Sequence, residues 1–208
     1  MDLERLKIFQ ETGESIGSAT RGEVHQKGLW HETFHCWFVG KEAGKPVIYL
    51  QQRSTHKEDF PCLLDITAAG HLLAHESVAD GVREIGEELG ISISFEELIS
   101  LGTIKNRIEQ PCIKDNEFCH SYLYDSTDTV LSFHVQQAEV EGLYKADFDA
   151  FYKLCMDADY PLMLTTVPVQ GEDKKVRQRK VTRKDFVPHD PDFLATVASR
   201  INQYFAGL

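Results

Sequence analysis

The pattern of apolar and polar residues alternates between a two-residue and a 3.6-residue period, which predicts a mixture of strands and helices. Short runs rich in β-branched and aromatic residues, bounded by turn residues, predict strands. The predicted strands cover residues 5–9, 19–25, 33–39, 46–52, 101–107, 117–124 and 135–144. The turn residues at 42–45 predict that two of these strands form a hairpin. Residues 53–61 are polar and predict a loop, and residues 176–187 predict either a strand or a basic loop.

Three segments have the apolar spacing of helices. One covers about residues 78–89, and its apolar stripe consists of Val78, Val82, Ile85 and Leu89. Gly90 follows it and predicts a left-handed cap at the helix end. Residues 148–156 and 192–205 predict two further helices, the second with Asp190 or Asp192 near its N-cap. Strands alternating with helices predict an α+β chain with a mixed sheet between helices.

The first of these helices also carries a stripe of carboxylates on a different face from its apolar residues. Glu84, Glu87 and Glu88 are spaced i, i+3 and i+4, so a helix places them together. Like charges at this spacing repel each other, whereas a divalent cation makes their proximity favourable. A solvated acidic face is the simpler interpretation of such a cluster. The alternative is a Mg²⁺ site that opens on a cleft and binds substrate phosphates.

The full string Arg83-Glu84-Ile85-Gly86-Glu87-Glu88-Leu89-Gly90-Ile91 resembles the core of the Nudix box of diphosphate hydrolases. Gly70 and Glu76 match the first half of the box, but six residues separate Glu76 from Arg83 where the family usually has seven. The resemblance implies a Nudix fold, a mixed β-sheet in an α/β/α sandwich with N-terminal strands. We expect a single domain over residues 1–208, with a core at about 30–155 and a C-terminal extension at 157–208. The extension contains a basic segment and the terminal helix.

A second resemblance, to isopentenyl-diphosphate isomerases of the same fold, rests on short segments scattered through the chain. These segments are residues 21–25, 29–34, 51–54, 70–71 and 115–117. The isomerase metal ligands match His25, His31, His71, Asp115 and Glu117. This resemblance implies a second metal site, and its imidazoles suit a transition metal better than Mg²⁺. The simpler interpretation is that each histidine hydrogen-bonds the backbone. The isomerases have a catalytic cysteine where this chain has Ala69, which has no ionisable group for acid–base work.

Together these resemblances imply an Mg²⁺-dependent Nudix hydrolase, with Mn²⁺ as a substitute, that cleaves a small-molecule diphosphate such as a nucleoside diphosphate-X. Glu84, Glu87 and Glu88 are the expected metal ligands, and either Glu87 or Glu117 is the general base. Arg83 is expected to pair with an acid such as Glu76 and to orient it. The expected substrate contacts are Arg53, Lys57, Gly70 and Arg107. An isomerase-like enzyme and a non-catalytic Nudix ligand-binding protein are the alternatives.

Composition and charge narrow the range of partners. The net charge of −11 argues against general nucleic-acid binding, which needs a positive surface. The chain has no apolar run long enough for a membrane span and no signal-peptide core, so we expect a cytoplasmic protein. Five scattered cysteines without a C-x-x-C pair predict buried, reduced thiols. The basic block from Lys174 to Lys184 is interpreted as a solvated hairpin, or as an arm for an anionic substrate or the acidic body of a homodimer partner.

Overall fold

The computed structural model describes residues 4–111, 113–170 and 176–207. The helices of this part of the chain are α1 (Arg21–Lys27), α2 (Arg83–Leu89), α3 (Phe148–Met156) and α4 (Pro191–Gly207). The strands are β1 (Arg5–Phe9), β2 (Ser15–Thr20), β3 (Trp30–Glu42), β4 (Lys45–Arg53), β5 (Leu64–Asp65), β6 (Ala68–His71), β7 (Ile99–Gln110), β8 (Ile113–Asp125), β9 (Val140–Asp147), β10 (Leu162–Val167) and β11 (Gln178–Val181). They form one mixed sheet in the order β11-β10-β9-β4-β3-β1-β2. Strand β5 pairs with β4, β6 pairs with β3, and the β7–β8 hairpin joins β3 through β8.

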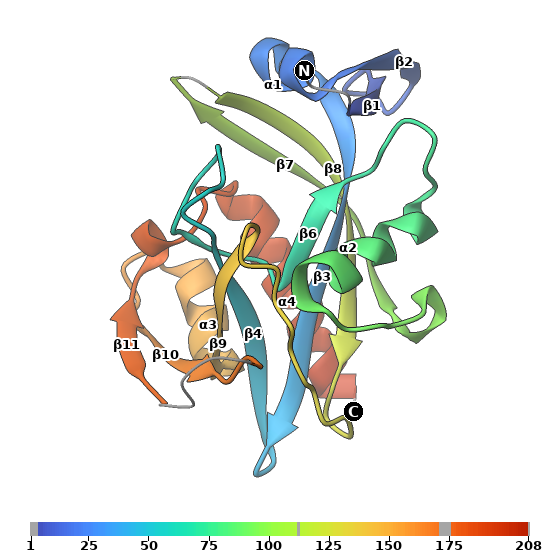
Figure 1. Ribbon diagram of the computed structural model, residues 1–208. Coiled ribbons are helices and arrows are strands. Elements are labelled where there is room, and N and C mark those ends of the chain that lie inside the picture. Colours follow the sequence, from blue (N-terminus) through green and yellow to red (C-terminus); the bar gives the residue numbers. More distant parts are fainter. Residues whose placement is uncertain (1–3, 112, 171–175, 208) are drawn as a thin grey trace.

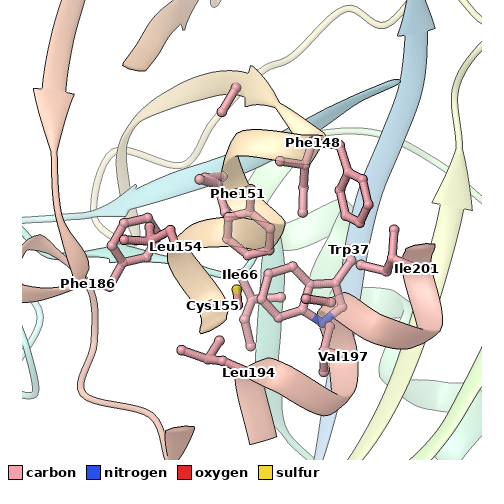
Figure 2. Packing of buried hydrophobic residues seen from close by; sticks show 14 of the residues in the cluster. Trp37, Ile66, Phe148, Phe151, Leu154, Cys155, Phe186, Leu194, Val197 and Ile201 are labelled. Atoms are coloured by element: carbon pink, nitrogen blue, oxygen red, sulfur yellow. The ribbon is translucent and has the colours of Figure 1, made fainter. Parts of the chain in front are cut away.

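The long central strand β3 organises the layers, because alternate side chains of a strand point to opposite faces of the sheet. Phe34 and Phe38 pack on one face with Ile85 and Leu89 of α2. Trp37 points to the other face and packs among side chains of α3 and α4, as Figure 2 shows. Figure 1 shows α2 in front of the central strands and α3 and α4 on the other side. The chain therefore has the predicted α+β architecture, with a mixed sheet between two helical layers.

The N-terminal region differs from the sequence prediction. Residues 19–25 were expected to form one strand, but β2 ends at Thr20 and α1 begins at Arg21. Thr20 Oγ1 accepts a hydrogen bond from the Glu23 backbone N–H at 3.3 Å, and Glu23 Oε2 accepts one from the Thr20 backbone N–H at 3.2 Å. This reciprocal capping box starts a helix, which the strand prediction overlooked. Gly28, with a φ of 64°, ends the helix after two turns.

The segment predicted as one helix over 78–89 contains a 3-10 helix, Val78–Val82, followed by α2. Gly81 lets this turn pack closely against β3, because a Cβ atom at this position would lie 2.6 Å from the Phe34 side chain. The predicted cap is correct, since Gly90 has a φ of 67°. The helix prediction at 148–156 is also confirmed by α3.

The second half of the chain contains more sheet than predicted. The strand expected at 135–144 begins only at Val140, because a turn closed by the Val140 N–H on Gln136 O precedes it. Strand β10 was not predicted, and it pairs with β9 on one side and β11 on the other. The 176–187 region consists of β11 and a short 3-10 helix, Arg183–Asp185. Strands β10 and β11 of the predicted extension thus continue the main sheet, and the boundary between core and extension stays a prediction.

Four cysteines fall in the described residues, and all are free. Cys36, Cys119 and Cys155 are buried as predicted, whereas Cys62 is exposed. Cys112 lies outside the described residues. None of the described helices is sufficiently long and apolar to cross a bilayer.

Candidate active site

A cavity of about 520 Å³ collects most of the residues that the sequence singled out. Its walls come from α2, β6, the ends of β3 and β8, and the loop after β4. Every predicted site residue lines it except His31 and Arg107. His31 is completely buried behind the cavity wall, and Arg107 lies on the outer surface of β7.

The carboxylates of α2 form one wall of this cavity. Glu88 is buried, and its Oε2 accepts hydrogen bonds from Gln51 Nε2 and from the Ala69 backbone N–H, both at 3.0 Å. Glu84 lies so close to β6 that a Cβ atom at Gly70 would collide with its carboxylate. The glycine of the motif is therefore needed for this close approach. Glu87 is more open, with 55% of its side chain exposed.

Burial disfavours the charged forms of these carboxylates, and the chain supplies too little positive charge to compensate. Burial, opposed by Arg83 and reinforced by repulsion from Glu87, raises the pKa of Glu84 to about 7. Burial and the neighbouring Glu84 raise the pKa of Glu88 to about 8. The anionic forms that a metal needs are thus disfavoured until a cation arrives. This excess of buried acid fits a divalent cation that takes oxygen ligands.

Arg83 is fully engaged within the protein. Its Nε and one terminal nitrogen contact Glu76 at 2.6 and 3.1 Å, and the same terminal nitrogen donates to the His71 carbonyl at 3.0 Å. The other terminal nitrogen contacts Glu84 at 2.7 Å and Glu87 at 3.0 Å. The loop that is one residue short therefore still delivers Glu76 to Arg83. One guanidinium serves three carboxylates, so this wall keeps a net negative charge.

Three histidines form a cluster next to the cavity. The Nε2 atoms of His25 and His71 are 3.2 Å apart, and ligand atoms of His25, His31 and His71 all lie within 4.8 Å of one another. His31 donates from Nδ1 to the Leu29 carbonyl at 3.1 Å. The simpler backbone-bonding interpretation thus holds for one nitrogen of His31. This bond leaves the Nε2 lone pair free on the side of the cluster, a common arrangement in metal-binding histidines.

Two carboxylates complete this second cluster. Asp115 Oδ1 lies 3.4 Å from His31 Nε2, and both atoms are buried without a hydrogen-bond partner in the described residues. Ligand atoms of His31, Asp115 and Glu117 also lie within 4.8 Å of one another. Burial lowers the pKa of His31 to about 4, so its imidazole is neutral. Neutral imidazoles beside orphaned buried oxygens fit a transition metal.

The predicted phosphate contacts differ in how far their side chains are already paired within the protein. Arg53 forms an ion pair with Asp65 at 3.0 Å and donates two further hydrogen bonds to the Asp59 carbonyl. Lys57 pairs with Glu139 at the cavity edge. Arg107 does not reach the cavity, because alternation along β7 places it outside, where it pairs with Glu11 at 2.7 Å and lies over the Trp30 ring.

Sequence reasoning missed a buried polar chain behind Glu117. Asn106 donates to Glu117 Oε2 at 2.7 Å and to His189 Nδ1 at 3.1 Å, and His189 Nε2 contacts Asp65 at 2.9 Å. Asp65 contacts Arg53, so the chain links a candidate base to a candidate phosphate contact. Asn106, His189 and Asp65 come from three separate segments and match no motif, so the sequence offers no signal that brings them together.

Solved structures with this architecture belong to the Nudix class. A MutT/Nudix family protein from Enterococcus faecalis superimposes with a TM-score of 0.54 at 15% identity, over 84% of this chain and 62% of that chain. The chain matches no family model.

Sequence comparison makes the assignment specific. A Nudix hydrolase of Clostridium acetobutylicum is 39% identical over 190 residues, which is 91% of this chain and 92% of the relative. An isopentenyl-diphosphate isomerase of Serratia proteamaculans is 31% identical over 121 residues, 58% of this chain and 65% of that protein. The chain belongs to the Nudix hydrolase family, whose members act on diphosphate-containing substrates.

Proposed function

We propose that this protein is an Mg²⁺-dependent hydrolase that cleaves the diphosphate linkage of a small organic diphosphate, X–O–P–O–P. The observation that carries the proposal is the acidic wall of the cavity. Glu88 is buried with only neutral donors, and Glu84 shares Arg83 with two other acids. Such a wall favours a hard divalent cation and a ligand whose phosphates bind that cation.

Glu84, Glu87 and Glu88 would hold Mg²⁺, and Mn²⁺ would substitute for it because it accepts the same oxygen ligands. When bound, the metal neutralises charge on the phosphates and lowers the pKa of a coordinated water. Arg83 acts as a positioning residue, since its contacts with Glu76 and the His71 carbonyl fix the direction of its fork toward Glu84. The histidine cluster with Asp115 and Glu117 would hold a second, transition metal.

Cations near the cavity would bind the substrate phosphates. Lys57 is the freer of the two predicted contacts, because its ion pair with Glu139 lies at the cavity edge. Arg53 would contact a phosphate while remaining bonded to Asp65. Gly70 lines the cavity beside the Glu84 carboxylate, and Arg21 adds a further cation to the lining. Arg107 is not part of this set, since it lies outside the cavity.

The reaction requires a base for the attacking water. The water oxygen forms a bond to phosphorus while the bridging P–O bond breaks, and the bridging oxygen leaves with the other phosphate. The proton of the water passes to a carboxylate. Glu87 and Glu117 are the two candidates, because both line the cavity and neither is committed to a buried ion pair.

Substitution of the carboxylates tests the proposal. We expect Glu88→Gln and Glu87→Gln each to lower Mg²⁺-dependent turnover of a diphosphate panel by at least about 10²-fold, because a metal ligand is lost but no core atom is removed. Glu96→Gln, at an exposed position beyond α2, is the matched control. Glu117→Gln distinguishes the two candidate bases. If Glu117 is the base, this variant should lose the increase in rate with rising pH, and if Glu87 is the base the increase should remain. The metal content of the same variants shows which of the two proposed metal sites each substitution affects. Near-normal turnover in Glu87→Gln and Glu88→Gln would contradict the proposal.

A further inference from the structure

Two side chains on the inner wall of the cavity have polar atoms without partners. Thr33 and His35 both line the cavity, and each is only 2% exposed. The Cys119 thiol lies beside Thr33 Oγ1 as a weak partner, and neither Thr33 Oγ1 nor His35 Nδ1 has a nitrogen or oxygen partner within the described residues. Buried polar groups of folded proteins are nearly always paired, because an unpaired group loses its bonds to water without compensation. Two such atoms on one wall indicate that a ligand supplies the missing partners.

The position of this pair relative to the acidic wall fits a substrate that spans both. His35 is the cross-strand partner of Ala69, and the Ala69 N–H donates to Glu88. Thr33 is likewise the partner of His71. Adjacent strands lie about 5 Å apart, so the two groups are roughly one strand spacing from β6. A diphosphate held at Glu84 and Glu88 would therefore place its organic group X near Thr33 and His35.

The chemistry of the pair selects a neutral hydrogen-bonding group. His35 is buried and forms no ion pair within the described residues, so its ring is neutral and carries one donor and one acceptor. The threonine hydroxyl can also donate and accept. A hydrocarbon would leave both atoms unpaired, and an anionic group would meet no positive charge here. A hydroxyl group matches both partners.

We propose that Thr33 and His35 bind a hydroxyl group on X, so that the preferred substrates are diphosphate esters of small hydroxylated alcohols rather than of hydrocarbon alcohols. This inference rests on the proposed hydrolase function. A site built to bond a substrate hydroxyl rejects the analogue that lacks it, because the buried groups of the site are then left unpaired. Thr33 and His35 are thus specificity residues, distinct from the metal ligands.

Matched substrates test the inference. Hydrolysis with Mg²⁺ is measured for butyl diphosphate and for its 2-, 3- and 4-hydroxy derivatives, which cover the positions that the hydroxyl can take along the chain. We expect kcat/KM for the best hydroxybutyl ester to exceed that for the butyl ester by at least about 10²-fold. Hydrolysis of all four at similar rates would overturn the inference and leave the hydrolase function intact. Absence of hydrolysis for these esters and for a broad diphosphate panel would instead remove the proposed function.

Variants assign the preference to the two residues. Thr33→Val and His35→Leu should each lower the hydroxybutyl-to-butyl ratio by about tenfold or more, chiefly by loss of the hydroxylated substrate. Thr103→Val is the matched control, because Thr103 is exposed on β7 outside the cavity. A ratio unchanged in both variants would show that the preference arises elsewhere, and would overturn the assignment.

Stability and metal content separate specificity from other roles of the pair. Thr33→Val should keep or raise Tm, because a methyl group replaces an unpaired buried hydroxyl. A clear fall in Tm would show that the hydroxyl supports the fold. His35 also lies within 4.8 Å of ligand atoms of Glu117 and Cys119. A metal loss in His35→Leu would make His35 a metal ligand and would overturn its role as a hydroxyl partner.

Discussion

Two sets of buried carboxylates line the same cavity and are treated in opposite ways by the protein. Asp65 accepts hydrogen bonds from His189 at 2.9 Å and from its neighbour's backbone at 2.8 Å, and it pairs with Arg53 at 3.0 Å. Burial alone would raise the pKa of Asp65, but the His189 hydrogen bond, the Arg53 guanidinium and the Ile66 backbone N–H hold it well below its usual range. Glu84 and Glu88 are buried without comparable compensation, and their pKa values are raised to about 7 and about 8.

We interpret this difference as one between acids that support the fold and acids that we propose to bind a ligand. Every oxygen of Asp65 has a partner supplied by the chain, so its charge is stable in the folded protein. The chain supplies Glu88 with two neutral donors only. Buried charge that the fold does not neutralise is expected where a cofactor or substrate completes the site.

Removing the satisfied acid should have the largest effect on stability. Asp65→Asn leaves the Arg53 guanidinium without its buried counter-ion, and we expect the free energy of unfolding to fall by about 3–5 kcal/mol. Chemical denaturation at pH 7 measures this change. Asp159→Asn, which removes an exposed carboxylate, is the control and should be neutral. A loss below about 1 kcal/mol for Asp65→Asn would contradict the structural role assigned to this pair.

The stability contributed by the two sets of carboxylates should also change with pH in opposite directions. Glu84 and Glu88 have folded pKa values of about 7 and about 8, above the value of about 4.3 for an unfolded chain. The folded state therefore binds more protons than the unfolded state between these limits, and stability falls as pH rises from about 5 to 8. The lowered pKa of Asp65 contributes stability above about pH 4, which is lost as pH falls further.

Denaturation in the presence of a chelator measures this slope without metal. Each group contributes up to about 1.4 kcal/mol per pH unit, and Glu117, whose pKa burial also raises to about 8, adds to the same trend. Glu88→Gln should flatten the slope between pH 5 and 8, and it should not destabilise the metal-free protein at pH 8. Saturating Mg²⁺ should flatten the slope of the parent protein as well. If the stability of the metal-free protein increased from pH 6 to 8, the charges of the buried α2 carboxylates would be compensated by the fold, contrary to our interpretation.

The two walls of the cavity also differ in how well the sequence predicted them. The α2 wall was predicted because its acids lie within five consecutive residues of one helix, where spacing alone places them together. The fold was predicted for the same reason, since its long strands and α3 have clear periods. The wall that contains Thr33, Asn106 and His189 depends on the parallel pairing of β3 with β8 and on the return of the chain before α4. Such juxtapositions arise from the tertiary structure, and one sequence gives no spacing that encodes them.

The smallest effect is expected for the exposed cations of the basic block, which can be compared with Arg53 in the cavity wall. Arg53 is half-buried and paired with Asp65, whereas Arg177 and Lys180 of the basic block are exposed and do not line the cavity. Lys174 and Lys175 lie outside the described residues. Arg179 is half-buried, with its guanidinium 4.7 Å from the centre of the Tyr144 ring. We therefore expect the block to act on substrate capture or on subunit pairing through long-range attraction, and to leave the chemical step unchanged.

Replacing Arg177, Arg179 and Lys180 with Gln should raise KM or weaken a homodimer while kcat stays nearly constant. Loss of the Arg179–Tyr144 contact should cost about 0.5–1 kcal/mol of stability. The KM of the parent protein should rise with salt more steeply than that of the variant, because salt screens exposed charges over about 10 Å at 0.1 M. Sedimentation at several salt concentrations separates pairing from capture. A folded and correctly assembled variant that loses kcat would place this segment in the catalytic site, and exposed cations would then matter as much as Arg53 in the cavity wall.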